Sequence, residues 1–273
     1  HPGVEFEIVV IKTTGDIDQR QNLSELGVGV FVRELEAALL DNRVDIAVHS
    51  LKDMPSSLPP EFALAAVPYR EDPRDAFISR NGETLEEIPA GSRIATGSVR
   101  RQALVKNIRP DLVVESLRGN VPTRLGKLDV AGGPDAVILA TAGLNRLGLQ
   151  DRITQHLSCS NFVSAVGQGA LALETRADDA TTAAIAVKLN HEGTLLEVTA
   201  ERAFLDEIGG GCSASVSAHA KIRGERLEFS AFASTPDGTQ VIRESLVDEA
   251  SNAEEVGKTM GQLFVERGAR QLI

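Results

Sequence analysis

The chain has 273 residues, and its 28 Lys and Arg residues against 39 Asp and Glu residues give a formal net charge of −11. An acidic total of this size disfavours DNA, RNA or an anionic membrane surface as the main partner, because each of these attracts a basic face. Hydrophobic residues make up 42% of the chain and charged residues 25%, which is the composition of a globular protein. This length accommodates two or three compact domains.

The sequence contains no uninterrupted apolar stretch of about 18 residues, so we expect no membrane-spanning helix. Its first residues lack the basic and then apolar pattern of an export signal. Only two cysteines occur, Cys159 and Cys212, too few for a disulfide framework. The five histidines show no metal-ligand spacing, so no metal site is expected. These features together predict a cytoplasmic protein without membrane or nucleic-acid partners.

The first two-thirds of the chain alternate short β-branched runs with helical patterns, which is typical of βαβ units and a mainly parallel sheet. Strands are predicted at Val4–Ile11, Val44–Val48, Phe62–Val67, Ala76–Ser79, Arg93–Thr96, Leu112–Glu115 and Ala136–Ala140. Helices are predicted at Phe31–Asn42, Val99–Ile108 and Pro122–Val130. The stretches Pro68–Pro73 and Ser164–Gly169 are predicted to cross between two lobes.

The last third of the chain has a different pattern. Helices are predicted at Thr181–Asn190, at Thr194–Ile208, which three glycines follow, and at Ala253–Arg267. Three alternating segments with turn signals between them predict strands at Ser215–Ile222, Arg226–Ser234 and Gln240–Val247. This pattern indicates a separate α+β domain of about 80 residues.

Local charge is more informative than the total. Between Arg93 and Arg146 there are nine basic residues and four acidic ones, so this window carries +5 while the rest of the chain carries −16. Seven of the nine are arginines, whose planar guanidinium groups bind carboxylates and phosphates in a bidentate way. Several lie where a strand gives way to a helix, the place where open α/β sheets collect ligands. The window therefore predicts a binding site for an anionic ligand.

Three strand ends in this window place arginines in similar surroundings. The first, Thr96-Gly97-Ser98-Val99-Arg100-Arg101, leads into a helix whose free N–H groups and dipole favour an anion. The second is Leu117–Arg124, which contains Arg118, and the third is Ala140–Arg146. The alternative interpretation is a set of ordinary capped helices with solvated arginines.

Another strand end, Val48–Pro55, presents a hydroxyl, an ammonium and a carboxylate together in Ser50, Lys52 and Asp53. A carboxylate at such a strand end is a candidate for handling protons and stabilising a developing cation. The alternative is an ordinary turn in which Lys52 and Asp53 are solvated.

The two cysteines differ in their sequence context. Cys212 follows three glycines and precedes small residues, which leaves a thiol accessible for covalent attachment. Cys159 has no such context and is predicted to be structural or incidental. The alternative for Cys212 is also an inert packing residue, as most single cysteines are.

Six segments of the chain resemble the porphobilinogen deaminase family, also called hydroxymethylbilane synthases. In chain order they are Val48–Pro55 (VHSLKDMP), Ala95–Ala103 (ATGSVRRQA), Leu117–Leu125 (LRGNVPTRL), Ile138–Gly148 (ILATAGLNRLG), Val166–Leu171 (VGQGAL) and Gly209–Cys212 (GGGC). Each is a weak signal alone, and their order over nearly the whole chain makes the resemblance specific. The sequence departs from the family pattern in three places. The family's usual first strand, with its Arg- and Ser-containing turn, has no counterpart, and Ser24 and Val28 stand where lysines are frequent. After the cysteine, Ser215 and Ser217 stand where the family commonly has a Pro and a Gly.

The resemblance implies an α/β fold with two periplasmic-binding-protein-like lobes of mainly parallel sheets and a smaller C-terminal α+β domain. In that division residues 1–69 and 168–190 form the lobe with the catalytic carboxylate, residues 70–167 form the arginine-rich lobe, and residues 191–273 form the C-terminal domain. It also implies a monomeric transferase of haem and tetrapyrrole synthesis. Such an enzyme joins four porphobilinogen units head to tail with loss of ammonia and releases hydroxymethylbilane by hydrolysis.

The resemblance also implies a dipyrromethane cofactor, bound to Cys212 by a thioether. In this mapping Asp53, with Lys52 beside it, is the catalytic carboxylate, which assists loss of the aminomethyl nitrogen and stabilises azafulvene and pyrrole cations. The cofactor and substrate cleft would be lined by Ser50, Lys52, Asp53, Thr96, Ser98, Arg100, Arg101 and Gln168. The carboxylates of the substrate or growing chain would be bound by Arg100, Arg101, Arg118, Arg124 and Arg146.

A function of another class competes with this interpretation: a two-lobed anion-binding or effector-sensing module without catalysis. A phosphate-binding protein is disfavoured, because the chain has no Gly-rich loop ending in Lys-Ser or Lys-Thr.

Overall fold

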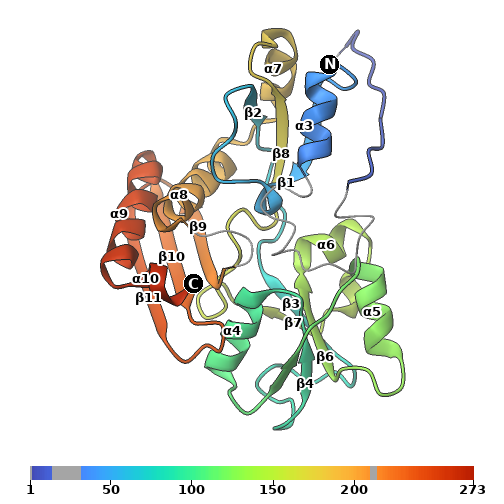
Figure 1. Ribbon diagram of the computed structural model, residues 1–273, viewed down its shortest axis with the longest axis vertical. Helices are drawn as coiled ribbons and strands as arrows, with labels where there is room; N and C mark the ends of the chain where they lie inside the picture. The colour runs from blue at the N-terminus through green and yellow to red at the C-terminus, as the bar shows by residue number, and fades with distance from the viewer. Residues whose placement is uncertain (1, 14–31, 210–213) are drawn as a thin grey trace.

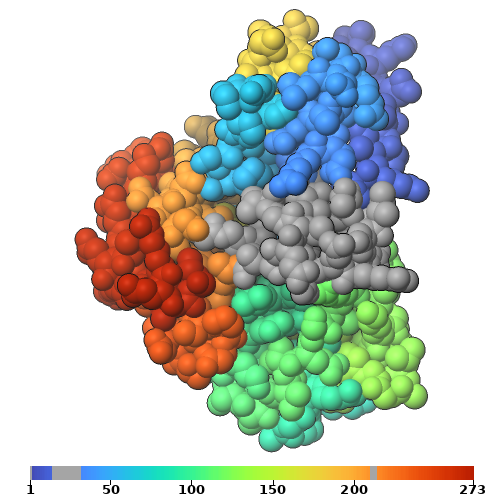
Figure 2. Space-filling model, viewed as in Figure 1, coloured from blue at the N-terminus to red at the C-terminus, as the bar shows by residue number. Residues whose placement is uncertain are grey.

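A computed structural model of the chain describes residues 2–13, 32–209 and 214–273. The strands form three sheets. In Figure 1 the elements around β1 and those around β4 lie at opposite ends of the molecule, and the C-terminal elements α8 to α10 lie along one side. Figure 2 shows the same division on the surface, with the orange and red C-terminal region beside both ends. Within the described ranges, no helix is both long and apolar enough to cross a membrane.

The first sheet has the strand order β1-β8-β2 and is antiparallel throughout. Its elements are α3 (Arg33–Leu40), β1 (Ala47–Ser50), η1 (Leu51–Asp53), β2 (Phe62–Ala66), β8 (Leu171–Arg176), α7 (Ala180–Ala186) and η3 (Val187–Leu189). The buried side chain of Leu39 on α3 packs with Ala47 and Phe62 of the sheet. Because η1 follows β1 directly, Lys52 and Asp53 stand at the end of a strand of this sheet.

The second sheet has the order β5-β4-β6-β3-β7 and is mixed. β4 pairs in parallel with β5 and β6, whereas β3 pairs antiparallel with β6 and β7. The elements are β3 (Asp75–Ser79), β4 (Arg93–Ala95), α4 (Val99–Ile108), β5 (Val113–Glu115), α5 (Val121–Asp129), β6 (Ala136–Ala140), α6 (Thr141–Arg146), η2 (Gln150–Arg152) and β7 (Gln155–Leu157). The arginine-bearing turns therefore follow three parallel strands and meet at one edge of the sheet.

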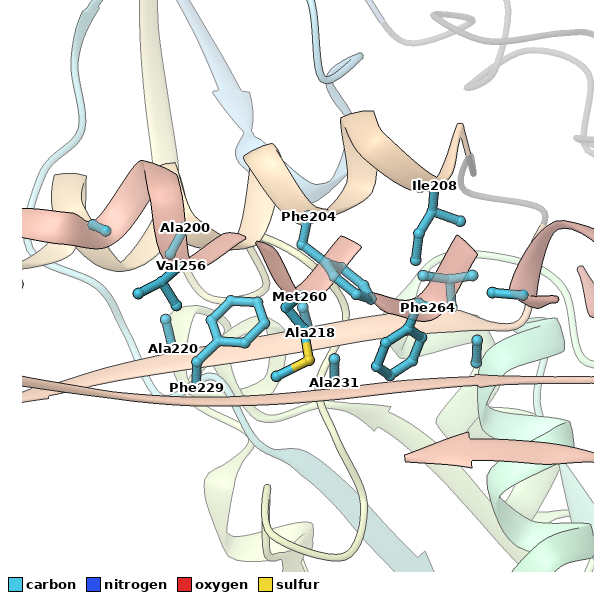
Figure 3. Packing of buried hydrophobic residues seen from close by; sticks show 14 of the residues in the cluster. Ala200, Phe204, Ile208, Ala218, Ala220, Phe229, Ala231, Val256, Met260 and Phe264 are labelled. Atoms are coloured by element: carbon cyan, nitrogen blue, oxygen red, sulfur yellow. The ribbon is translucent and has the colours of Figure 1, made fainter. Parts of the chain in front are cut away.

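The C-terminal sheet has the order β11-β10-β9 and is antiparallel. Its elements are α8 (Glu192–Ile208), β9 (Val216–Arg223), β10 (Arg226–Ser234), β11 (Val241–Glu249), η4 (Ala250–Asn252), α9 (Ala253–Glu266) and α10 (Ala269–Leu272). Figure 3 shows α8 and α9 packed on the sheet through buried apolar side chains. Phe204 makes edge-to-face contacts with Phe229 and Phe264, with ring centroids 5.8 and 5.1 Å apart.

The chain passes between the first two sheets twice, and we call residues 67–74 the first crossing and residues 158–170 the second crossing. The backbone N–H of Glu71 donates to the carbonyl of Gly169 at 3.2 Å. Gly169 has a φ of +88°, and a side chain there would overlap the Glu71 carbonyl oxygen, so glycine is required for this contact. The predicted crossings at Pro68–Pro73 and Ser164–Gly169 are confirmed.

Two fold predictions are wrong. Residues 4–11 form no strand: they pair with no described strand, and Phe6, Ile8 and Val10 are 66%, 88% and 83% exposed. Apolar and β-branched residues favour a strand only where a neighbour completes its hydrogen bonds. The sheets are not mainly parallel, because one is antiparallel and one is mixed. The sequence analysis also missed β7, β8 and α6.

The close contact of α8 and α9 leads to a test of packing. A side chain at Gly257 would overlap the carbonyl oxygen of Ala200 and lie 2.8 Å from the Cβ of Ala203. We expect Gly257→Ala to lower the free energy of unfolding by about 1–3 kcal/mol. The measurement is the urea midpoint at unchanged slope.

The matched control is Gly126→Ala on α5, where an added Cβ meets nothing within 4 Å. This variant should be neutral or more stable by about 0.5–1 kcal/mol, because alanine loses less conformational entropy in a helix. A Gly257→Ala protein as stable as Gly126→Ala would contradict the described contact.

Candidate active site

The turns that follow β4 and β5 are joined directly. Ser98 caps α4 by accepting the N–H of Arg101 at 3.4 Å, and the Leu117 N–H donates to the Thr96 carbonyl at 3.2 Å. A side chain at Gly97 would lie 2.5 Å from the Leu117 carbonyl oxygen, so the turns approach this closely only with glycine there. The contact brings the arginine-bearing segment after β5 next to the start of α4.

Arg100 and Arg101 converge on Asp75, the first residue of β3. The Arg100 Nη1 lies 2.8 Å from Asp75 Oδ2, and the Arg101 Nη2 lies 2.7 Å from Asp75 Oδ1. The Arg101 Nε also donates to Oδ1 at 2.9 Å. All three residues are buried, and Asp75 is 0% exposed. Burial by itself would raise the pKa of Asp75, but the two arginine charges lower it to about 2.

Gln168, predicted to line the cleft, joins this buried cluster. Its Nε2 donates to Asp75 Oδ1 at 3.0 Å and to the Pro73 carbonyl at 2.7 Å. Its Oε1 accepts from the Arg101 Nη2 at 3.3 Å. Since Pro73 lies on the first crossing and Gln168 on the second, one amide connects both crossings to the arginine pair.

Lys52, in η1 directly after β1 of the first sheet, interacts electrostatically with this cluster. Burial lowers the pKa of Lys52; the charges of Asp53 and Asp75 oppose the shift, and those of Arg101 and Arg100 add to it. These interactions place the end of β1 close to the start of α4. Asp53 is half-buried, and its carboxylate makes no hydrogen bond within the described residues. Among the described residues, Asp53 is thus an uncommitted and half-buried carboxylate, whereas Asp75 is engaged by two arginines.

The other predicted arginines lie around the same cluster. Burial lowers the pKa of Arg124, and the charge of Arg101 lowers it further, so the two cations are near each other. Arg146 donates from Nη2 to the Gly169 carbonyl at 2.8 Å and so adjoins the second crossing. Arg118, in the turn before α5, is half-buried. Cys212 lies outside the described residues, as do Ser24 and Val28.

The remaining predicted cleft residues occupy the ends of strands. Ser50 is half-buried at the end of β1. Thr96 is 0% exposed, and its Oγ1 accepts the Ser98 N–H at 3.3 Å. Thr96 therefore stabilises the turn between β4 and α4 from a buried position, and Ser98 caps α4.

Several basic residues of the +5 window bind the protein itself. Lys106 donates to the Leu112 carbonyl, and Lys127 donates to the Arg118 carbonyl at 3.0 Å. Arg109 donates to the carbonyl of Leu85 at 2.8 Å. The positive charge around Asp75 thus comes from a subset of the window together with Lys52.

A buried ion pair that was not predicted from the sequence supports the site. Arg70 of the first crossing donates to Glu201 of α8 through Nη1 at 2.7 Å and Nη2 at 3.1 Å. The same carboxylate accepts the N–H of Gly167, on the second crossing, at 2.7 Å and that of Ala220, on β9, at 2.9 Å. One carboxylate therefore joins both crossings to the C-terminal domain.

A signal for this pair was present in the sequence. Glu197 and Glu201 lie four residues apart on the stripe of α8 that also contains Val198 and Phe204, and all four are buried. A carboxylate on the apolar face of a helix requires a cationic partner, because an unpaired buried charge is costly.

His219 on β9 lies beside Glu201, with Nδ1 3.7 Å from Oε1 and 14% of its side chain exposed. Burial by itself lowers the pKa of His219, but its interactions with Cys159 and Glu201 raise it to about 9. Burial likewise favours the neutral form of Glu201, yet Arg70 and His219 lower its pKa to about 2. Both groups are therefore charged near neutral pH.

This raised pKa leads to a pH dependence of stability. Folded His219 keeps its proton up to a pH of about 9, whereas the unfolded residue loses it near about 6.5, so stability falls with rising pH in this interval. We expect His219→Gln to remove that part of the decline, at most about 3 kcal/mol. Urea denaturation between about pH 6 and 10 measures it.

The control is His156→Gln, because the His156 side chain is 37% exposed and lies 3.9 Å from its nearest carboxylate oxygen, on Asp72. This variant should keep the decline of the parent protein. Identical profiles for the parent and His219→Gln would disprove the assignment.

Two domain models of one protein family match the chain. Residues 1–184 match "Porphobilinogen deaminase, dipyromethane cofactor binding domain", and residues 195–266 match "Porphobilinogen deaminase, C-terminal domain". Together they cover nearly all of the described sequence.

The chain also has distant similarity to solved structures. The periplasmic domain of BvgS from Bordetella pertussis is 16% identical over 57% of this chain and 30% of its own, with a TM-score of 0.36. The amino acid ABC transporter substrate-binding protein AbpA from Streptococcus pneumoniae, bound to L-arginine, is 14% identical over 58% of this chain and 65% of its own, with a TM-score of 0.33. The chain spans less than two thirds of either structure, and overlaps this limited carry no argument about the site.

Proposed function

This chain belongs to the porphobilinogen deaminase family, transferases of haem and tetrapyrrole synthesis that carry a dipyrromethane cofactor, and from this premise we propose its reaction. It joins four porphobilinogen units head to tail on the covalently bound cofactor, loses one ammonia per unit, and releases hydroxymethylbilane by hydrolysis. The observation that carries the proposal is the half-buried carboxylate of Asp53 next to Lys52, whose ammonium group interacts with Arg100, Arg101 and Asp75.

The charges of the site fit an oligopyrrole. Lys52, Arg100, Arg101 and Arg124 lie close together, and Asp75 neutralises only part of their charge. A buried excess of positive charge is costly unless an anion accompanies it. Every pyrrole ring of porphobilinogen and of dipyrromethane carries two carboxylates, which supply such anions. The dipyrromethane cofactor therefore fits the donors that the chain presents.

The described contacts favour different roles for the predicted residues. We assign the binding of substrate and chain carboxylates to Arg100, Arg118 and Arg124, with Arg146 at the rim by the second crossing and Ser50 and Ser98 lining the cleft. Arg101, Thr96 and Gln168 make protein contacts that hold this lining in place. The predicted division into residues 1–69 with 168–190, 70–167 and 191–273 remains our proposal for the domains.

The bound dipyrromethane supplies a nucleophilic pyrrole carbon. When the aminomethyl C–N bond of porphobilinogen breaks, its electron pair leaves with nitrogen and positive charge spreads over the substrate's pyrrole ring. The Asp53 carboxylate stabilises that charge at the ring N–H. Lys52, whose pKa is lowered by burial, lies beside it and donates a proton to the leaving nitrogen.

The proposal includes porphobilinogen as the small-molecule partner, a monomeric state and a cytoplasmic location. The family acts on a small substrate, and within the described ranges no helix could cross a membrane. The competing hypothesis is an anion-binding module without catalysis. The cysteine predicted to hold the cofactor separates the two hypotheses, because a binding module needs no covalent group.

The first test is the mass of the intact chain. We expect the purified protein to carry an added dipyrromethane mass, and Cys212→Ser to lack it, because a hydroxyl cannot form the thioether. Cys159→Ser is the matched control, since Cys159 is a free thiol elsewhere in the chain, and it should keep the adduct. Active protein without an adduct, or an adduct that persists in Cys212→Ser, would refute the attachment.

The second test concerns the catalytic carboxylate. Asp53→Asn keeps the shape of the side chain without its charge, so we expect it to fold, to retain the cofactor mass, and to lose about 100-fold or more in ammonia release from porphobilinogen. Asp41→Asn, an exposed carboxylate in the same lobe, is the control and should keep full turnover. Near-normal ammonia release by Asp53→Asn would show that another group stabilises the charge.

A further inference from the structure

The two adjacent arginines of α4, Arg100 and Arg101, differ in how many of their guanidinium nitrogens bind protein groups. Arg101 directs Nε and Nη2 to Asp75, Nη1 to the Ile138 carbonyl at 3.2 Å, and Nη2 also to Gln168. Within the described residues, Arg100 engages polar partners only through Nη1, which reaches the Val163 carbonyl at 2.7 Å and Asp75 Oδ2 at 2.8 Å. In the described part of the chain, Arg101 thus directs all three guanidinium nitrogens to protein acceptors, whereas Arg100 directs only Nη1 to them.

Two adjacent buried arginines can lie this close only with an anion between them, and Asp75 supplies it. Arg100 and Arg101 both lie in the first turn of α4, where the helix dipole is positive and two guanidinium groups repel each other. Asp75 divides its carboxylate between them, with one oxygen for each arginine. Because Asp75 is 0% exposed, this carboxylate is positioned to orient the arginines and does not itself face a ligand.

Asp75 is in turn fixed by the two crossings. It is the first residue of β3, directly after the first crossing, and Oδ1 accepts the amide of Gln168 from the second crossing at 3.0 Å. The same amide donates to the carbonyl of Pro73 at 2.7 Å. A shift of one crossing against the other therefore moves the carboxylate on which Arg100 depends.

We propose that Asp75 is a positioning residue, which holds the Arg100 guanidinium toward the carboxylates of the bound ligand with the help of Gln168. The proposal rests on the proposed function for the identity of that ligand. Asp75 acts through Arg100 and makes no contact with substrate. Since Arg100 binds the carboxylates equally in the ground state and the transition state, losing its orientation raises KM more than it lowers kcat.

The simplest variant is Asp75→Asn, for which we expect a KM for porphobilinogen about tenfold higher or more, with kcat changed less. Removing one buried anion between two cations also threatens folding. A second variant, Asp75→Leu/Arg101→Met, removes one charge of each sign and replaces them by apolar side chains of similar size, which is often neutral for stability. It should keep the Tm of the parent within a few degrees and still show the raised KM.

The matched control is Asp135→Asn. Asp135 precedes β6 at the opposite end of the same sheet, and its carboxylate accepts the Arg93 N–H at 2.7 Å. This variant should keep the parent KM. Gln168→Leu, which leaves all charges in place, should raise KM by an intermediate factor, because Asp75 then loses its hydrogen bond to the second crossing.

The outcomes separate a positioning role from a structural one. A raised KM in folded Asp75→Leu/Arg101→Met supports the proposal. A KM within about twofold of the parent in any folded Asp75 variant overturns it. Failure of both Asp75 variants to fold also overturns it, because the carboxylate would then serve stability alone.

Failure of the proposed function would look different. Porphobilinogen, used as the probe, should raise the Tm of the parent protein and raise that of Asp75→Leu/Arg101→Met less. If porphobilinogen raises the Tm of the parent protein without turnover, the proposed reaction is contradicted. The role of Asp75 is then still tested by comparing this rise in Tm with that of Asp75→Leu/Arg101→Met. A parent protein that shows neither effect overturns both proposals.

Discussion

The arrangement of the whole molecule depends on the carboxylate of Glu201. It binds Arg70 through two hydrogen bonds and accepts one backbone N–H from the second crossing and one from β9. Because Glu201 is 0% exposed, each of these donors would be left unpaired in the interior without it, and unpaired buried donors are costly. The C-terminal domain therefore holds the two crossings in place through Glu201. The described parts of each lobe farther from the crossings do not contact this carboxylate.

A second carboxylate, Asp75, has the corresponding position on the side of the site. Both carboxylates are buried and bound to arginine, and both have a pKa lowered to about 2. They differ in what they hold. Glu201 binds a single arginine through both carboxylate oxygens, whereas Asp75 is shared between two arginines and neutralises only part of their charge. The first arrangement stabilises the two crossings, and the second leaves buried positive charge that a ligand anion can neutralise.

The sequence predicted elements well where the signals are local. The ranges of α4 and β10 are those predicted, because Ser98 caps the helix and glycine-containing turns bound the strand. Pairing direction depends on contacts between distant segments, so the mainly parallel sheet was wrong, and a strand at residues 4–11 needed a partner that no local pattern supplies.

The same reasoning explains what was found and missed at the site. The resemblance and the strand-end pattern selected Lys52, Asp53 and the arginines, all next to turns that glycine or proline marks. Asp75 and Glu201 were missed because a charged residue is expected on the surface by default. Their partners lie 26 and 131 positions away in the chain, beyond any local signal.

The net charge of −11 acquires a specific meaning from these contacts. At the ionic strength of a cell, charges farther apart than about 8 Å are largely screened, so the acidic exterior only weakly opposes the approach of an anionic pyrrole. Around the buried Arg100 and Arg101 the dielectric is lower, so the part of their charge that Asp75 does not neutralise acts at short range with much greater strength. Several basic residues of the +5 window bind backbone carbonyls instead and contribute nothing there. Recognition of the ligand carboxylates is therefore decided by which arginines are buried and oriented, and neither the total charge nor the charge of the window measures that.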